Sequence, residues 1–89
     1  MLSHKQKIQG LVQVPNGYYD VEFEALTEGG YLARVPALEA STFGQTLDAA
    51  QVMVADLVAG WLAVAQEDGL VIPEPKPLIQ ITPRVVFAQ

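Results

Sequence analysis

A long apolar segment with a helix start signal at one end and a stop signal at the other constrains the fold of this chain more than any other feature. Thr46 precedes the segment and belongs to the residue types preferred as helix N-caps, and Asp48 places a carboxylate near the positive end of the helix dipole. Gly69 follows the segment as the glycine that commonly ends a helix, and Pro73 lies beyond it. These signals predict one helix that runs to about Asp68.

The apolar side chains of this helix are not confined to one face. One stripe suits a surface that packs on a core: Leu47, Ala50, Val54, Leu57, Val58, Trp61 and Ala65. Other apolar residues lie elsewhere around the axis: Met53, Ala59, Leu62, Ala63 and Val64. A helix this apolar is normally buried on more than one side. We therefore expect one side to pack on a sheet and another to be covered by a second copy or by the chain ends, and we predict a homodimer or higher homo-oligomer.

A membrane helix is the alternative interpretation of this segment. The apolar run from Val52 to Ala65 spans 14 residues and contains Asp56, whereas about 20 predominantly apolar residues are needed to cross a bilayer. We expect no membrane span. The first ten residues lack the apolar core of a signal peptide, and the chain has no cysteine. Both features favour a cytoplasmic protein that is not exported.

Residues 18–26, YYDVEFEAL, alternate in a way that predicts a strand. A period of two with aromatic and β-branched residues is typical of a strand with one buried face. The buried face is expected to hold Tyr19, Val21, Phe23 and Ala25. The opposite face is expected to carry Tyr18, Asp20, Glu22 and Glu24.

The sequence TEGG after this strand predicts a β-hairpin with a three-residue loop at 27–29. Such a loop needs a residue with positive φ at its end, and Gly29 supplies it. The second strand is then residues 31–35. The predicted register pairs Leu26 with Gly30, Phe23 with Ala33 and Glu22 with Arg34, the last pair setting opposite charges across from each other.

A third strand completes the predicted sheet. Pro36 ends the second strand, because proline has no N–H to donate to a neighbouring strand. Residues 41–43 predict the third strand, which Gly44 closes just before the helix. The fold class is therefore α+β, with a three-stranded antiparallel sheet packed on one long helix and extra short strands at the ends.

The N-terminal extra strand has two possible interpretations. Residues 8–14 fit a strand that turns at Pro-Asn-Gly into Tyr18. Ile8, Leu11 and Val12 also fit one turn of a helix. Both interpretations stay open at this point.

The C-terminal part predicts a connector followed by short strands. Proline stands at alternate positions from 73 to 77, which favours an extended segment without ladder hydrogen bonds. Residues 78–82 and 84–88 look like short strands. The expected organisation is a single domain over 1–89, with a core at 18–75 and a short C-terminal strand segment at 76–89.

The order of these signals is itself distinctive. Gly-Gly-Tyr, a strand that ends in Val-Pro, a short loop and Thr-x-Gly-x-Thr precede the long helix. The residues that carry this pattern are Tyr31, Ala33, Val35, Pro36, Gly44, Thr46, Asp48 and Ala50. From residue 18 to residue 75 the pattern resembles the HicB-like antitoxin family. The resemblance implies a partial RNase H-like fold and a protein that neutralises a small basic ribonuclease toxin of the HicA type.

The chain also departs from the family pattern. Glu39-Ala40 stands where the family often has Pro-Gly, and Ala49 occupies the second acidic position at the helix start. Many members carry a C-terminal helix-turn-helix or ribbon-helix-helix module for operator DNA, and the fourteen residues after Pro75 are too few for either. Five basic against ten acidic residues give a net charge of −5, which disfavours a phosphate backbone. We expect no direct nucleic-acid binding.

The carboxylates of the first predicted strand raise the possibility of a metal site. Asp20, Glu22 and Glu24 share one face, and clustered carboxylates can hold Mg²⁺ and support phosphodiester cleavage. A solvated sheet face explains them better, because Arg34 is expected to lie among them and no other strand residue completes a site. We expect no metal.

The other reactive side chains form no catalytic set either. His4 is the only histidine and stands near the chain end, and Ser3 and Ser41 have no positioned base. The sequence lacks a glycine-rich phosphate-binding motif. We therefore expect neither enzyme activity nor a cofactor.

Two functions remain from the sequence. The first is an antitoxin-like module that binds a small basic partner protein, as an acidic chain would favour. Its expected contact surface is the polar face of the first predicted strand, with Tyr18, Asp20, Glu22 and Glu24. The second is a stand-alone, homo-oligomeric small domain that binds an unknown ligand or protein.

Overall fold

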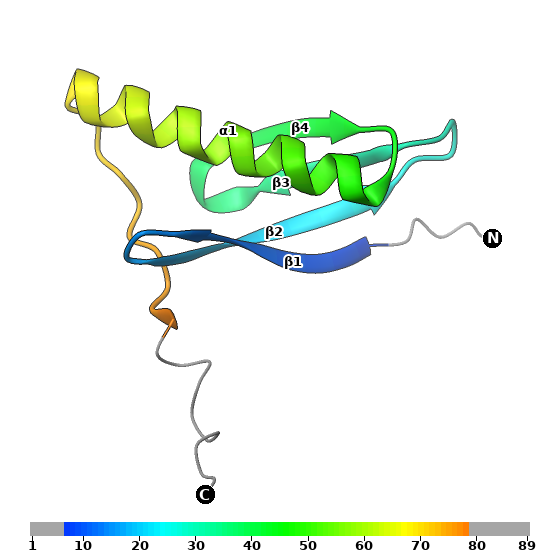
Figure 1. Cartoon of the computed structure of the whole chain (residues 1–89), viewed down its shortest axis with the longest axis horizontal. Helices are drawn as coiled ribbons and strands as arrows, with labels where there is room; N and C mark the ends of the chain where they lie inside the picture. The colour runs from blue at the N-terminus through cyan, green and yellow to red at the C-terminus, as the bar shows by residue number, and fades with distance from the viewer. Residues whose placement is uncertain (1–6, 79–89) are drawn as a thin grey trace, which may run out of the picture.

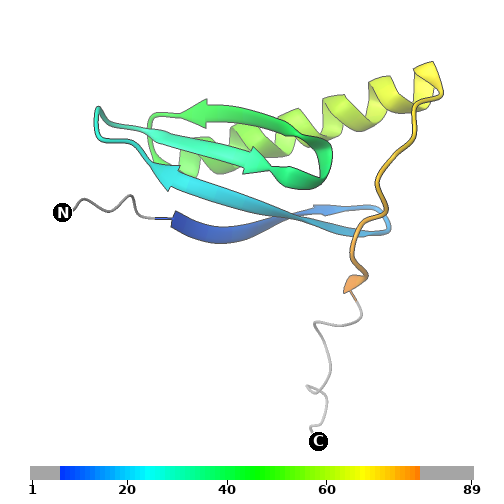
Figure 2. The same ribbon diagram turned by 180° about the vertical axis from the view of Figure 1, so that it is seen from behind.

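A sheet of four antiparallel strands carries one long helix on one face in the computed structural model, which describes residues 7–78 (Figure 1). The strands follow the chain in order, β1-β2-β3-β4. Their bounds are Lys7–Val14 for β1, Gly17–Ala25 for β2, Tyr31–Val35 for β3 and Ala40–Gly44 for β4. A 3₁₀ turn at Pro36–Leu38 links β3 to β4, and α1 spans Leu47–Asp68. Seen from behind, no helix or strand of the described residues covers the face of the sheet away from α1 (Figure 2).

The N-terminal segment forms the fourth strand of the sheet and is longer than the short extra strand that the sequence predicted at this end. β1 is eight residues long and pairs with β2 along its whole length, from Lys7 opposite Glu24 to Val14 opposite Gly17. The helical interpretation of residues 8–12 is therefore wrong. The two residues between β1 and β2 make a tight connection, so the full length of β1 lies beside β2.

The β2–β3 hairpin has the predicted register. Glu22 lies opposite Arg34 and Phe23 opposite Ala33, and the Leu26 N–H donates to the Gly30 carbonyl at 3.0 Å. Gly29 has the expected positive φ, 104°. Local signals, alternation and loop chemistry, were therefore sufficient to define this pairing.

The passage from β4 into α1 explains the Gly-x-Thr motif. A Cβ on Gly44 would overlap the backbone of Ala50, so only glycine lets the first turn of the helix rest against the end of the strand. Thr46 caps the helix as predicted, and its Oγ1 accepts the Ala49 N–H at 3.0 Å. At the far end Gly69, with φ 68°, is the left-handed cap.

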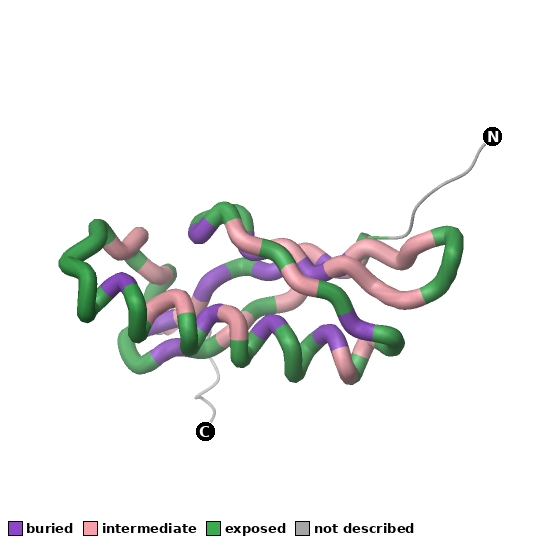
Figure 3. The backbone as a smooth tube through the Cα atoms, turned by 90° about the horizontal axis from the view of Figure 1, so that it is seen from above, coloured by how far each residue is buried: buried purple, intermediate pink, exposed green. Residues whose placement is uncertain are grey.

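The core lies between α1 and the sheet. Buried residues recur along α1, as the colouring of the backbone in Figure 3 shows. The predicted stripe is confirmed: Ala50, Val54, Val58 and Ala65 are buried, while Leu47, Leu57 and Trp61 are partly buried. From the sheet, the core takes the predicted inward residues Tyr19, Val21 and Phe23 together with Val14, Ala33 and Val35. Each fully buried valine contributes on the order of 1.5–3 kcal/mol relative to an exposed one.

After α1 the chain returns to the sheet. The Tyr19 hydroxyl donates to the Pro73 carbonyl at 2.5 Å, and Tyr18 and Lys76 exchange two backbone hydrogen bonds of 2.9 Å. Gly17 permits this crossing, because a Cβ there would overlap the Lys76 carbonyl oxygen. Residues 71–75 belong to no helix or strand, in line with the predicted connector. The predicted strands at 78–82 and 84–88 fall, apart from Leu78, outside the described residues.

The helix is more apolar over its full length than the 14-residue run suggested. By length and composition alone, the 22 residues of α1 are sufficient to cross a bilayer. However, α1 packs along the sheet, and an open sheet cannot enter hydrocarbon because its unpaired edge N–H and C=O groups would have no partner there. The outward side chains of α1 therefore face water or another surface.

Candidate functional site

The four residues predicted for partner contact do lie on one face. Tyr18, Asp20, Glu22 and Glu24 are on the side of β2 away from α1, because the alternating residues between them are buried under the helix. We call this side the open sheet face. Lys7 and Arg34 lie on it too, since β1 and β3 pair with β2 at Glu24 and Glu22.

The carboxylates of the open sheet face are each paired with a cation. Arg34 Nη2 lies 3.4 Å from Glu24 Oε1, and Arg34 Nη1 lies 3.6 Å from Glu22 Oε1. Lys7 Nζ lies 4.0 Å from Glu22 Oε2. Lys76 Nζ donates to Asp20 Oδ2 at 2.5 Å, and this hydrogen bond raises the pKa of Lys76. The open sheet face is therefore close to neutral, although the sequence predicted an acidic one.

No metal centre forms from the predicted carboxylates. Within residues 7–78, no three side chains of His, Cys, Asp or Glu are grouped so that they could hold an ion. Ser41 is exposed on β4, opposite Arg34, and His4 and Ser3 lie outside the described residues.

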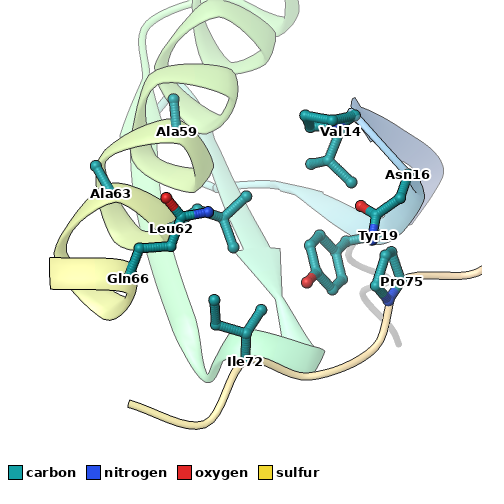
Figure 4. A pocket seen from close by; sticks show the side chains of 10 residues that line it. Val14, Asn16, Tyr19, Ala59, Leu62, Ala63, Gln66, Ile72 and Pro75 are labelled. Atoms are coloured by element: carbon teal, nitrogen blue, oxygen red, sulfur yellow. The ribbon is translucent and has the colours of Figure 1, made fainter. Parts of the chain in front are cut away.

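A cavity of about 500 Å³ lies between the C-terminal half of α1, the β1–β2 turn and the segment after the helix (Figure 4). In Figure 4, Tyr19, Leu62 and Ile72 point into this space from three different parts of the chain. Its polar groups include the side-chain amides of Asn16 and Gln66. Burial raises the pKa of Tyr19, whose hydroxyl already donates to Pro73. The cavity has the volume of a small-molecule site, but its lining suits an apolar group held by amides rather than acid–base chemistry.

A second hollow lies along one side of α1, between residues that pack on the core and residues that are exposed. This groove, about 440 Å³ in volume, is lined by Asp56, Leu57, Gly60, Trp61, Val64 and Leu70. It is open above Gly60, where no atom of residues 7–78 lies within 4 Å of the position that a Cβ would take. The sequence had indicated apolar residues on this side of the helix but not a groove. The signal that could have found it is Gly60, a costly residue in a helix interior.

The surface around this groove combines exposed apolar and acidic side chains. We define the outer face of α1 by its exposed residues Val52, Met53, Asp56, Gly60, Val64 and Glu67. Val52 is 62% exposed and Val64 53%. The helix contains no Lys, Arg or His. In the described part of the chain, no cation lies within ion-pair distance of Asp56 or Glu67.

Three surfaces thus differ in chemistry. The open sheet face is charged but internally paired, and the cavity is apolar with two amides at its lining. The outer face of α1 joins exposed apolar side chains to carboxylates that have no cationic neighbour among residues 7–78. Comparisons of the chain with family models, with curated proteins and with solved structures found no match.

Proposed function

We propose that this protein is an antitoxin-like binding module that neutralises a small basic ribonuclease of the HicA type in the cytoplasm. The proposal starts from the residue pattern that resembles the HicB-like family. It is supported by the order of elements, in which a hairpin, a Val-Pro step, a short strand and Gly-x-Thr lead into one long helix. A net charge of −5 favours association with a basic protein.

One observation carries the proposal beyond resemblance. Asp56 and Glu67 remain without a cationic neighbour in residues 7–78, and they lie beside exposed apolar side chains. Protein interfaces bury apolar cores within polar rims, and complementary charge across them speeds association. A ribonuclease surface that binds RNA phosphates is basic, so carboxylates presented on a folded scaffold can compete with RNA for it.

The protein would act by binding, without catalysis and without contacting nucleic acid itself. Lys7, Arg34 and Lys76 are already engaged by carboxylates of the open sheet face. Neutralising phosphates would require breaking these pairs, which weakens any gain from DNA or RNA contact. A partner that used the predicted contact residues Tyr18, Asp20, Glu22 and Glu24 would meet the same competition.

A homo-oligomeric ligand-binding domain is the second candidate. Five large apolar residues on or just after α1 are exposed, which favours self-association: Val52, Met53, Val64, Leu70 and Val71. The cavity of about 500 Å³ would then hold the ligand. This candidate predicts a stable dimer that needs no basic partner.

Co-expression with the products of the neighbouring reading frames tests the proposal. A short basic protein encoded beside this chain should co-purify with it, and its RNA cleavage should stop at a stoichiometric amount of this protein. If the neighbouring frames encode no such protein, or if the purified pair does not associate, the antitoxin proposal is wrong.

A further inference from the structure

We infer that the basic partner docks on the outer face of α1, with two of its cationic side chains on Asp56 and Glu67 and its apolar side chains in the groove beside Gly60. The inference rests on the proposed function, because it assumes a basic protein partner. It changes the contact surface from the open sheet face, which the sequence favoured, to the helix.

The residues of this face form a continuous stripe. Met53, Asp56, Gly60, Val64 and Glu67 follow one another at intervals of three or four residues. Such intervals place side chains on one side of an α-helix. All five are exposed, whereas the buried residues of α1 recur on the side that faces the sheet. A partner segment could therefore lie along the helix without displacing the core.

The groove gives the partner a place for close approach. Gly60 leaves the helix backbone uncovered between Leu57, Trp61 and Val64. Glycine inside a helix costs about 1 kcal/mol relative to alanine, and no described residue comes within 4 Å of the position that a Cβ on Gly60 would take. A surface that approaches from outside would use the missing side chain.

The two carboxylates specify the partner's charge spacing. Asp56 and Glu67 are eleven positions apart, which corresponds to about 16 Å along the axis at about 1.5 Å per residue. An amphipathic basic segment with cations separated by about that distance matches both carboxylates at once. Apolar side chains between the cations would then enter the groove.

A second copy of this chain fits the same face less well. Two outer faces in contact would bring together Asp56 and Glu67 from both copies, with no basic residue on either helix to compensate. Like charges brought together at an interface cost free energy. The charge pattern therefore favours a basic partner over self-association, although the apolar side chains would serve either.

The open sheet face is also less suited to a basic partner. Its carboxylates already contact Arg34, Lys7 and Lys76 at 2.5–4.0 Å. A partner cation would have to displace these side chains. On the outer face of α1 no such exchange is needed, so more of the electrostatic attraction remains for binding.

The experiment compares three variants by calorimetric titration with the short basic protein encoded beside this chain. The Asp56→Lys, Glu67→Lys double variant reverses the charges of the proposed site. The Glu28→Lys, Glu39→Lys double variant changes the net charge equally at two exposed positions away from α1. Gly60→Gln fills the groove without altering charge, and it should fold because the site is open and Gln is a good helix former. Circular dichroism checks that each variant is folded.

We expect the charge reversal on α1 to weaken binding about 100-fold and Gly60→Gln to weaken it at least about tenfold. The control double variant should change the affinity only a few-fold, through slower association. If both α1 variants bind like the wild type while the wild type binds tightly, the docking surface is wrong and the proposed function stands. If the wild type does not bind, the proposed function fails instead. A wild-type dimer that Gly60→Gln converts to a monomer would assign the face to a second copy and overturn the inference.

Discussion

Tyr18 and Lys76 exchange two backbone hydrogen bonds at the edge of β2 where β3 does not pair with it. β3 pairs with β2 only from Glu22 to Ala25, so β3 gives the first half of β2 no strand partner on that side. The chain after α1 supplies one at a single position. This bridge also brings Lys76 to Asp20, which is how the open sheet face loses part of its acidic character.

Gly17→Ala should release this bridge. The new Cβ would overlap the Lys76 carbonyl oxygen, and the Lys76 backbone cannot move away without losing its bonds to Tyr18. Hydrogen exchange at the Lys76 amide should therefore become much faster, while the amides in the middle of α1 keep their protection. Unchanged protection at Lys76 would show that the segment after α1 has another anchor.

Gly29→Val should destabilise the β2–β3 hairpin by about 1–3 kcal/mol. In the part of the chain that the structure describes, no neighbour lies within 4 Å of the added Cβ, so the cost comes from the positive φ of 104°. Glu28→Val adds the same side chain at the adjacent exposed loop position and serves as the control, with little change expected. Urea unfolding measures both. Equal stability of the two variants would mean that the loop adopts another conformation.

Replacement of glycine by alanine should have opposite effects at Gly44, the last residue of β4, and at Gly60 within α1. Gly44→Ala forces a Cβ into the backbone of Ala50 and should destabilise the domain by about 3 kcal/mol or more, because strand and helix must separate. Gly60→Ala meets open space and should stabilise α1 by up to about 1 kcal/mol. Thermal unfolding measures the change in stability of both variants. A loss of stability in Gly60→Ala would contradict the exposed position of this residue.

Stability should fall at high pH through Tyr19. Burial raises the pKa of Tyr19 above its ordinary value of 10.0, so the folded state holds the hydroxyl proton more tightly than the unfolded state. The contribution of protonated Tyr19 to folding stability is fully present below pH 10. It is lost as the pH rises from 10 through the pKa of Tyr19 in the folded state. Lys76, whose pKa is also raised above 10.5, adds a loss of the same sign.

The Tyr19→Phe variant separates the pH-dependent loss of stability through Tyr19 from the loss through Lys76. The variant also loses the hydrogen bond to Pro73, which should cost about 0.5–1.5 kcal/mol at pH 8. Urea unfolding at pH 8 and pH 11 should show the gap between wild type and variant narrowing at the higher pH. A gap that stays constant would mean that Tyr19 titrates as it does in the unfolded chain.

The parts of the fold that the sequence predicted depend on neighbouring residues. Thr46 and Gly69 bound the helix through local capping, and the Glu22–Arg34 register follows from alternation and one glycine. The length of β1 was missed, because Pro15 before Asn-Gly obscured the hairpin signal and short-range periodicity allowed a helical turn as well.

The candidate site was harder to predict, because its charge depends on distant parts of the chain. Arg34 was expected beside Glu22, but Lys7 depends on the full length of β1 and Lys76 on the chain after α1. Composition gave the net charge without its distribution. Pairing removes most of the acidity from the open sheet face and leaves that of α1, and only the assembled fold shows this.

The attachment of the segment after α1 also determines how the molecule would respond to a pulling force. A load on the C-terminal end meets the Tyr18–Lys76 bridge and the Pro73–Tyr19 contact before it reaches the sheet or helix. These few hydrogen bonds would break one after another, because the force reaches them in sequence and is not distributed over all of them at once. At low force the segment between Gly69 and Lys76 would therefore detach and extend while α1 remains on the sheet. Its release would delay the unfolding of the core.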